Sequence, residues 1–243
     1  MADFQAQVQG ITSLPTLTDD GTTTPTQTEL SQFLKDGVMD VTAKWVDIKP
    51  GDIQKFQVEH AETTSQGGIA ITGKIIRVLR ETGTDEDWRG CRMIDPGLQS
   101  KVLDIDSMDY ASNYNPVFHI DENNKINVFP VPAGSNNAYK VYYVNDTPQN
   151  DSGIALIYSH STIKYFPKEL VHVVVLYASI KALEAKMNSY TIDDEDETLV
   201  TSLRLIHKQI VDQYETYFND AKLAIKQQNE KMNALMSQAK GAK

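Results

Sequence analysis

Apolar positions recur at helical spacing through the C-terminal third of the chain and predict two consecutive helices. The first begins at Phe166-Pro167, because proline fits the first turn of a helix, where its missing N–H is not needed. The second follows the acidic run from Asp193 to Glu197, whose charge complements the positive end of a helix dipole. Its apolar stripe continues through Leu199, Leu203, Ile206, Ile210, Tyr214, Tyr217, Ala221, Ala224, Met232 and Leu235.

This stripe is longer than the preceding helix can cover. At 1.5 Å per residue, a helix of about 40 residues is roughly 60 Å long, and the first helix has about half that length. Other subunits would have to supply the missing cover. We therefore expect subunit or bundle packing by Leu199, Leu203, Ile206, Ile210, Tyr214 and Tyr217.

The N-terminal part of the chain predicts an arm followed by a helix. Residues 1–25 are expected to form an extended arm, because the stretch 12–28 is rich in Thr, Asp, Gly and Pro and does not order by itself. Thr26 to Glu29 matches a capping box and opens an amphipathic helix that Pro50-Gly51 ends. Gly37 inside this helix costs about 1 kcal/mol relative to Ala, which suggests close packing against another element.

The middle of the chain, residues 51–161, changes to short β-rich segments separated by turn residues. The pattern predicts a hairpin of 55–62 with 69–81, and a further strand over 88–95. A three-stranded meander is predicted over the segments 116–120, 126–132 and 138–146.

The predicted class is α+β, with an antiparallel β module inserted between the helices. Residues 26–50 and 162–243 would form the helical bundle, in which the last 20 or so residues are a partner-docking extension.

Composition limits the kinds of partner. With 40% hydrophobic and 23% charged residues, the 243-residue chain is typical of soluble globular proteins. A net charge of −10 opposes binding to nucleic-acid phosphates but suits a surface along which DNA slides. The first ten residues lack a signal-peptide pattern, and the richest apolar run, 170–180, is too short to span a membrane.

Sequence motifs offer weak support for a nucleotide or metal site. Residues 68–75 have the glycine and lysine spacing of a phosphate-binding loop, but Ile75 stands where Mg²⁺ binding needs a hydroxyl. The acidic groups 104–109 and 121–124 do not fit a calcium-binding loop, and the second favours a hairpin turn. The histidines lack metal-ligand spacing: His60, His119, His160, His172 and His207.

The single thiol, Cys91, has two interpretations. Arg89 and Arg92 beside it could lower its pKa, whereas a small buried residue on a strand is the favoured interpretation. The sequence therefore predicts no catalytic residue, no metal and no cofactor, and we expect that the protein is not an enzyme.

The last segment, from Lys222 onward, carries basic and apolar residues together and reverses the overall charge. It is either a solvated helix end, where lysines suit the helix dipole, or a segment that docks on an acidic partner surface.

Three stretches carry a resemblance to a known family: PTQTELSQFLKDGVMDV, YNPVFHIDENNKINVFPVPAGSNN and FPKELVHVVVLYASIKALEAKM. Together they resemble structural proteins of tailed bacteriophages, particularly those of marine and cyanobacterial hosts. The order of elements from Pro25 to Asp220 is similar to head-to-tail adaptors of the "tail tubular protein A" kind. That resemblance implies a ring, typically of twelve copies, beneath the portal protein, with helices around the DNA channel. The extension past Asp220 departs from the family pattern.

The resemblance implies a structural virion protein of the neck, assembled in the host cytoplasm. It would join the portal to a tail nozzle, tube or fibre protein and continue the DNA channel without binding DNA specifically. Portal docking is then expected of Lys222, Lys226, Lys231, Met232, Leu235 and Met236. Two alternatives stay open: a tail-completion or tail-terminator protein, and a soluble ligand-binding or hydrolytic protein that uses the β module as its pocket wall.

Overall fold

The structure, a computed structural model, describes residues 2–62, 68–132, 138–193 and 197–241. The chain forms two compact units. One unit is helical and the other contains the sheets, which confirms the α+β class. The helical unit comprises Met1–Asp52 and Thr147–Lys243, and the β unit comprises Ile53–Asp146. Residues 147–161 thus belong with the helices and not with the β module, where the sequence placed them. One reason is that the His160 carbonyl oxygen accepts a hydrogen bond from the Phe4 N–H at 2.8 Å.

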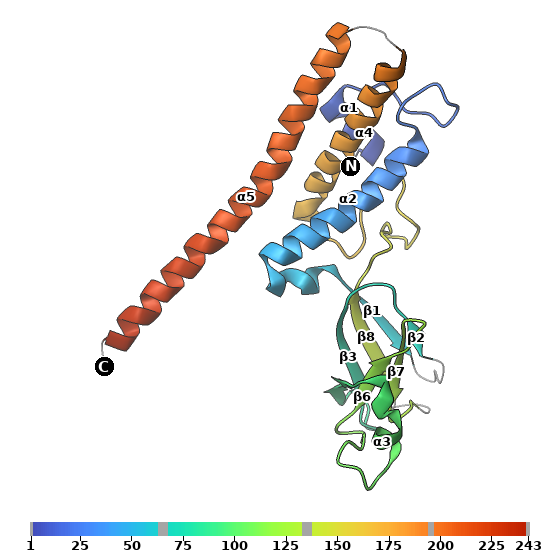
Figure 1. Cartoon of the computed structure of the whole chain (residues 1–243), viewed down its shortest axis with the longest axis vertical. Coiled ribbons are helices and arrows are strands. Elements are labelled where there is room, and N and C mark those ends of the chain that lie inside the picture. Colours follow the sequence, from blue (N-terminus) through green and yellow to red (C-terminus); the bar gives the residue numbers. More distant parts are fainter. Residues whose placement is uncertain (1, 63–67, 133–137, 194–196, 242–243) are drawn as a thin grey trace. The chain divides into compact units, whose positions relative to one another are not determined.

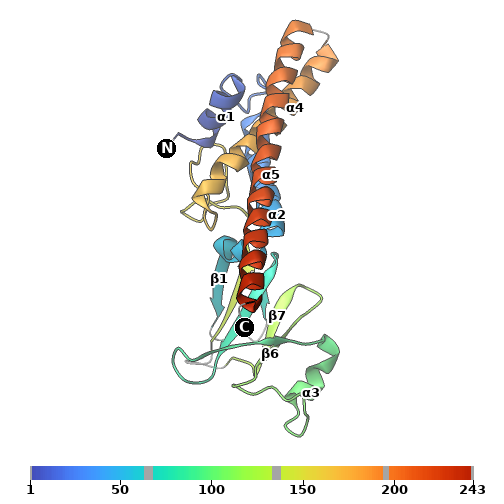
Figure 2. The same cartoon turned by 90° about the vertical axis from the view of Figure 1, so that its left-hand side faces the viewer.

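The helical unit is built around α4, which contacts three other helices (Figures 1 and 2). The helices are α1 (Phe4–Thr12), α2 (Gln27–Ile48), α4 (Val171–Asp193) and α5 (Glu197–Gly241), with short 3₁₀ turns η1 (Pro50–Phe56) and η3 (Lys168–Leu170). Apolar positions at helical spacing predicted α4, and its buried residues lie on all of its sides: Val173, Val174, Val175, Leu176, Ala178, Ala182 and Leu183. They are buried because α1, α2 and α5 cover different sides of α4.

The prediction of an extended N-terminal arm is wrong for its first half. Residues 4–12 form α1, and Asp3 caps it by accepting a hydrogen bond from the Ala6 N–H at 2.7 Å. Phe4 and Val8, four residues apart, are fully or almost fully buried in the helical unit. The helix was not predicted because the composition of this segment is polar. Two apolar residues on one face are nevertheless enough to attach it to α4.

The predicted start of α2 is confirmed. Thr26 Oγ1 accepts a hydrogen bond from the Glu29 N–H, and Glu29 Oε2 accepts one from the Thr26 N–H at 2.7 Å, which completes the capping box. Close packing at Gly37 is also confirmed: a Cβ atom there would lie 3.0 Å from the ring of Tyr177 on α4.

The β unit consists of two four-stranded sheets, in the orders β1-β8-β3-β4 and β2-β7-β6-β5. The strands are β1 (Gln57–Glu62), β2 (Ile69–Ala70), β3 (Ile75–Glu81), β4 (Trp88–Gly90), β5 (Arg92–Met93), β6 (Val117–Ile120), β7 (Lys125–Phe129) and β8 (Tyr139–Val144), with η2 (Pro96–Leu98) and α3 (Gln99–Leu103) between β5 and β6. Buried residues from both sheets form one core, for example Val78 and Val141 with Ile126 and Val128.

Three strand pairings differ from the prediction. The expected hairpin of β1 with β3 does not form, because β8 lies between the two strands and pairs with both. The expected meander holds for the β6–β7 hairpin, but β8 belongs to the other sheet. The predicted strand over 88–95 is broken at Cys91 into β4, which pairs with β3, and β5, which pairs in parallel with β6. These pairings depend on contacts distant in sequence, which a local pattern does not carry.

Gly73 lies where the backbone of β8 passes very close, and this predicts a sharp effect of substitution. A Cβ atom at Gly73 would lie 1.7 Å from the Val144 carbonyl oxygen, so Gly73→Ala forces the backbone apart. We expect a loss of more than about 2 kcal/mol of unfolding free energy, measured by denaturant titration. Gly90→Ala is the matched control, since nothing lies within 4 Å of its Cβ position. Equal stability of the two variants would contradict this account.

Candidate interaction surface along the C-terminal helix

The first half of α5 is fixed against the rest of the helical unit. Of the six predicted packing residues, Leu203, Ile210 and Tyr214 are buried, Ile206 and Tyr217 are half-buried, and Leu199 is 39% exposed at the start of the helix. Phe218, which the sequence analysis missed, is also buried. Its position four residues after Tyr214 is the signal that could have identified it.

Aromatic side chains from three helices meet at the end of this buried stretch. The ring centroids of Tyr177 on α4 and Tyr214 on α5 are 6.1 Å apart, and those of Tyr214 and Phe218 are 5.2 Å apart. Trp45 of α2 lies 6.2 Å from Tyr217. These contacts join α2, α4 and α5 at one level, at centroid separations typical of stabilising aromatic pairs.

A polar group fixes how α2 and α5 are aligned. The Tyr214 hydroxyl donates a short hydrogen bond to Asp40, and Lys44 Nζ lies 2.8 Å from the same carboxylate. Lys44 Nζ also lies 4.7 Å from the centroid of the Tyr214 ring. Burial raises the pKa of Tyr214 strongly, and the bond to Asp40 raises it further. The hydroxyl therefore keeps its proton and its partner throughout the neutral range.

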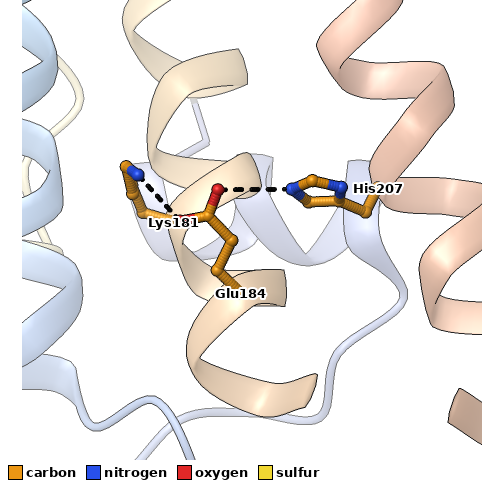
Figure 3. A network of polar contacts seen from close by, with 3 residues as sticks. All are labelled: Lys181, Glu184 and His207. Carbon is orange, nitrogen blue, oxygen red and sulfur yellow. Dashed lines mark hydrogen bonds and ion pairs between the residues drawn. The ribbon is translucent and has the colours of Figure 1, made fainter. Parts of the chain in front are cut away.

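A second polar group connects α4 to α5 (Figure 3). Glu184 on α4 lies 2.7 Å from Lys181 Nζ and 3.4 Å from the Nε2 atom of His207 on α5. The hydrogen bond to Glu184 raises the pKa of Lys181, against the smaller lowering effect of burial. All three side chains are partly exposed. Because Glu184 lies on α4 and His207 on α5, their contact links the two helices.

The second half of α5 continues beyond these contacts (Figures 1 and 2). The helix has 45 residues against 23 in α4, and the part after Phe218 is about 35 Å long. At 100° per residue, Ile225, Met232 and Met236 continue the face of Tyr214 and Phe218. Met232 is 45% exposed and Met236 57% exposed, so the apolar stripe is left uncovered here.

Lysines flank this uncovered stripe on both sides. The helical period places Lys222 and Lys226 along one edge and Lys231 along the other, and all three are exposed. Of the six residues predicted to dock on the portal, five are therefore exposed, and the side chain of Leu235 lies outside the described residues.

Two open grooves run beside α5, near the end of α2. One of about 470 Å³ is lined by α2, α4 and α5, and one of about 370 Å³ is lined by α2 and α5. They share Asp47, Ile48 and Lys222, so they are neighbours along the surface of the helix. Neither is an enclosed pocket of the kind that surrounds a small substrate.

The other candidate sites of the sequence are Cys91, the segment 68–75 and the acidic group 121–124. None of them forms a site within the described residues. Burial raises the pKa of Cys91 to about 12, against the smaller effect of Arg80, so the thiol is not activated. Gly73 of the phosphate-loop-like segment is required by the approach of β8. Asp121 forms the β6–β7 turn, where the Lys125 N–H is the main cause of its lowered pKa.

The residues that the structure describes contain no cluster of metal-binding side chains and no helix suited to span a membrane. No group of three His, Cys, Asp or Glu side chains in this part of the chain could hold a metal ion. None of the helices described is long and apolar enough to cross a membrane.

No protein-family model matches this chain, and no curated protein matches it significantly.

The protonated Tyr214 predicts a loss of stability in alkali. Because its pKa lies above the ordinary 10.0, the folded state holds a proton that the unfolded chain releases. This contribution is complete below pH 10 and is lost as pH rises further; the raised pKa of Lys181 acts in the same direction. Tyr214→Phe should flatten the fall of the unfolding temperature between about pH 10 and 11. Circular dichroism at 222 nm measures it.

The control for this experiment is Tyr165→Phe, which changes an exposed tyrosine of the same unit. It should leave the pH dependence as in the wild type. An equally steep alkaline decline in Tyr214→Phe and the wild type would contradict the role of the Tyr214 proton.

Proposed function

We propose that this protein is a non-enzymatic, ring-forming adaptor of a bacteriophage neck, which joins the portal to the tail and continues the DNA channel. The observation that carries the proposal is the uncovered second half of α5. Its exposed apolar stripe, with Met232 and Met236, is flanked by lysines and extends beyond the helices of its own unit. Such a surface favours protein contacts, because exposed apolar patches are costly in a solitary soluble chain.

Charge supports the same proposal. The chain carries 33 acidic and 23 basic residues, whereas the segment from Ala221 to Lys243 has five lysines and one glutamate. The basic end of α5 suits an acidic, apolar groove on the portal, and the acidic remainder suits a wall along which DNA slides without sticking. The resemblance of three sequence stretches to phage adaptors gives the proposal its biological setting.

The hydrolytic alternative has less support. The groove in the β unit, about 330 Å³, is lined by Gln54, Gln57, Ile76, Arg77, Leu79 and Tyr142. Of these, Tyr142 has a raised pKa, caused mainly by burial and also by its hydrogen bond to Glu59. A protonated phenol beside an arginine offers neither a nucleophile nor a general base near neutral pH. A tail-completion protein stays as the second candidate, and its partner separates it from a portal adaptor.

Truncation after Asp220 tests the proposal. The variant keeps the buried stripe from Leu203 to Phe218, so it should stay folded and lose less than about 1 kcal/mol of stability. It should no longer bind purified portal protein from the same virus. Interferometry measures the binding, and circular dichroism checks the fold.

A point variant separates the apolar contact from the loss of the helix end. Met232→Asp with Met236→Asp should weaken portal binding at least tenfold, which corresponds to about 1.4 kcal/mol. Leu205→Asp is the control, because Leu205 is 60% exposed on the opposite face of the first half of α5. Unchanged portal binding by the truncated chain would refute this assignment, and binding to tail proteins alone would favour the tail-completion candidate.

A further inference from the structure

The β unit carries a second uncovered surface, in the segment from Leu103 to Tyr114, which we name the acidic loop. Its apolar side chains point into solvent: Leu103 is 57% exposed, Ile105 74%, Tyr114 72%, and Met108 is fully exposed. Isolated exposed apolar residues are ordinary on protein surfaces. Five of them within twelve residues, with Tyr110 at 37% exposure included, are not ordinary, and such groups mark contact sites.

The acidic loop is held in place at its base. Val102 and Ala111 are almost completely buried in a small core with Ile94, Val117 and Phe129. The Ala111 N–H donates a hydrogen bond to the Val102 carbonyl oxygen at 2.9 Å and closes the loop. Nearby, the Asn113 amide donates to the Thr82 carbonyl oxygen at 3.0 Å.

Further hydrogen bonds fix the loop between these ends. The Ser107 N–H donates to the Asp104 carbonyl oxygen at 3.0 Å, and the Tyr110 N–H donates to the Ser107 carbonyl oxygen at 3.1 Å. The exposed side chains are thus displayed on a fixed backbone. Such preorganisation lowers the entropy lost on binding.

Charge defines what this loop can bind. Asp104, Asp106 and Asp109 alternate with the exposed apolar residues, and the segment contains no Lys or Arg. Asp104 and Asp106 are exposed and Asp109 is half-buried. A complementary surface must therefore offer an apolar pocket with Lys or Arg at its rim. This is the opposite of the acidic, apolar groove that suits the lysine-flanked stripe of α5.

We propose that the acidic loop is the docking site for a second protein, distinct from the portal, whose surface has an apolar pocket rimmed by Lys and Arg. The inference rests on the proposed adaptor function, which requires two partners. A patch that complements the basic end of α5 would face the acidic loop with like charge, which costs binding energy, so the two sites need patches of opposite charge. Ile105 and Met108 enter the pocket, and Asp104 and Asp106 pair with its rim.

The test uses the full-length protein and the purified portal, tail tube, nozzle and fibre proteins of the same virus. Ile105→Asp with Met108→Asp should weaken binding to one tail protein at least tenfold, while portal binding stays within twofold of the wild type. Because both side chains are exposed, the unfolding temperature should change by less than about 3 °C. The control is Ile154→Asp, an apolar position in the helical unit that is 59% exposed.

A charge variant tests the predicted basic rim. Asp104→Asn with Asp106→Asn should slow association with the same tail protein severalfold and reduce its salt dependence. Asp212→Asn with Glu215→Gln removes the same charge from exposed positions of the helical unit and should leave association unchanged.

The outcomes separate this inference from the proposed function. Portal and tail binding that both survive the loop variants would overturn the acidic-loop site and leave the adaptor proposal standing. Loss of self-association in the loop variants, with tail binding intact, would make a second copy the occupant and also overturn it. A wild-type chain that binds neither portal nor tail proteins would refute the adaptor function, and this inference with it.

Discussion

The helical unit depends on the burial of α4, whose apolar residues are covered on every side along much of its length. Residues on all sides of α4, such as Val173, Leu176 and Leu183, are almost inaccessible, so α1, α2 and α5 must each contribute an apolar face. Burial of apolar area, at about 25 cal/mol per Å², is the main driving force for this arrangement. Because α4 has 23 residues and α5 has 45, only part of α5 can satisfy it. The uncovered stripe is thus a direct consequence of unequal helix lengths.

Apolar contacts alone would leave the position of α5 along α4 poorly defined, because a shift of one turn preserves most of a stripe. The polar contacts remove that freedom. Tyr214 donates to Asp40 on α2, and His207 lies beside Glu184 on α4, so a shift of 5.4 Å would break both. The aromatic contacts of Tyr214 and Phe218 then end the fixed part. With its first half fixed, the second half of α5 presents its lysines and methionines in one defined direction.

The sequence revealed those features that depend on neighbouring residues. The Thr26 capping box, the stripe of α5 and its excess length over α4 follow from spacing alone, and the structure contains all three.

Features that depend on residues distant in the sequence could not be predicted from it. The pairing of β1 with β8 joins Gln57 to Val144, and nothing near either residue encodes it. The helix α1 was missed because only Phe4 and Val8 mark its buried face. For the candidate surfaces, spacing identified the basic end of α5, whereas the exposure of Met108 depends on how Val102 and Ala111 are buried.

The two proposed docking surfaces have opposite charge, which would keep an adaptor from assembling in the wrong order. Apolar contacts discriminate weakly, because most apolar pockets accept most apolar side chains. The lysines beside Met232 give that surface a positive charge, and the aspartates beside Met108 give the acidic loop a negative charge. A partner with an acidic groove is attracted to α5 and repelled by the acidic loop, and a partner with a basic rim behaves in the opposite way. Since charge acts over about 10 Å at 0.1 M salt, this proposed selection would operate during approach, before the apolar surfaces meet.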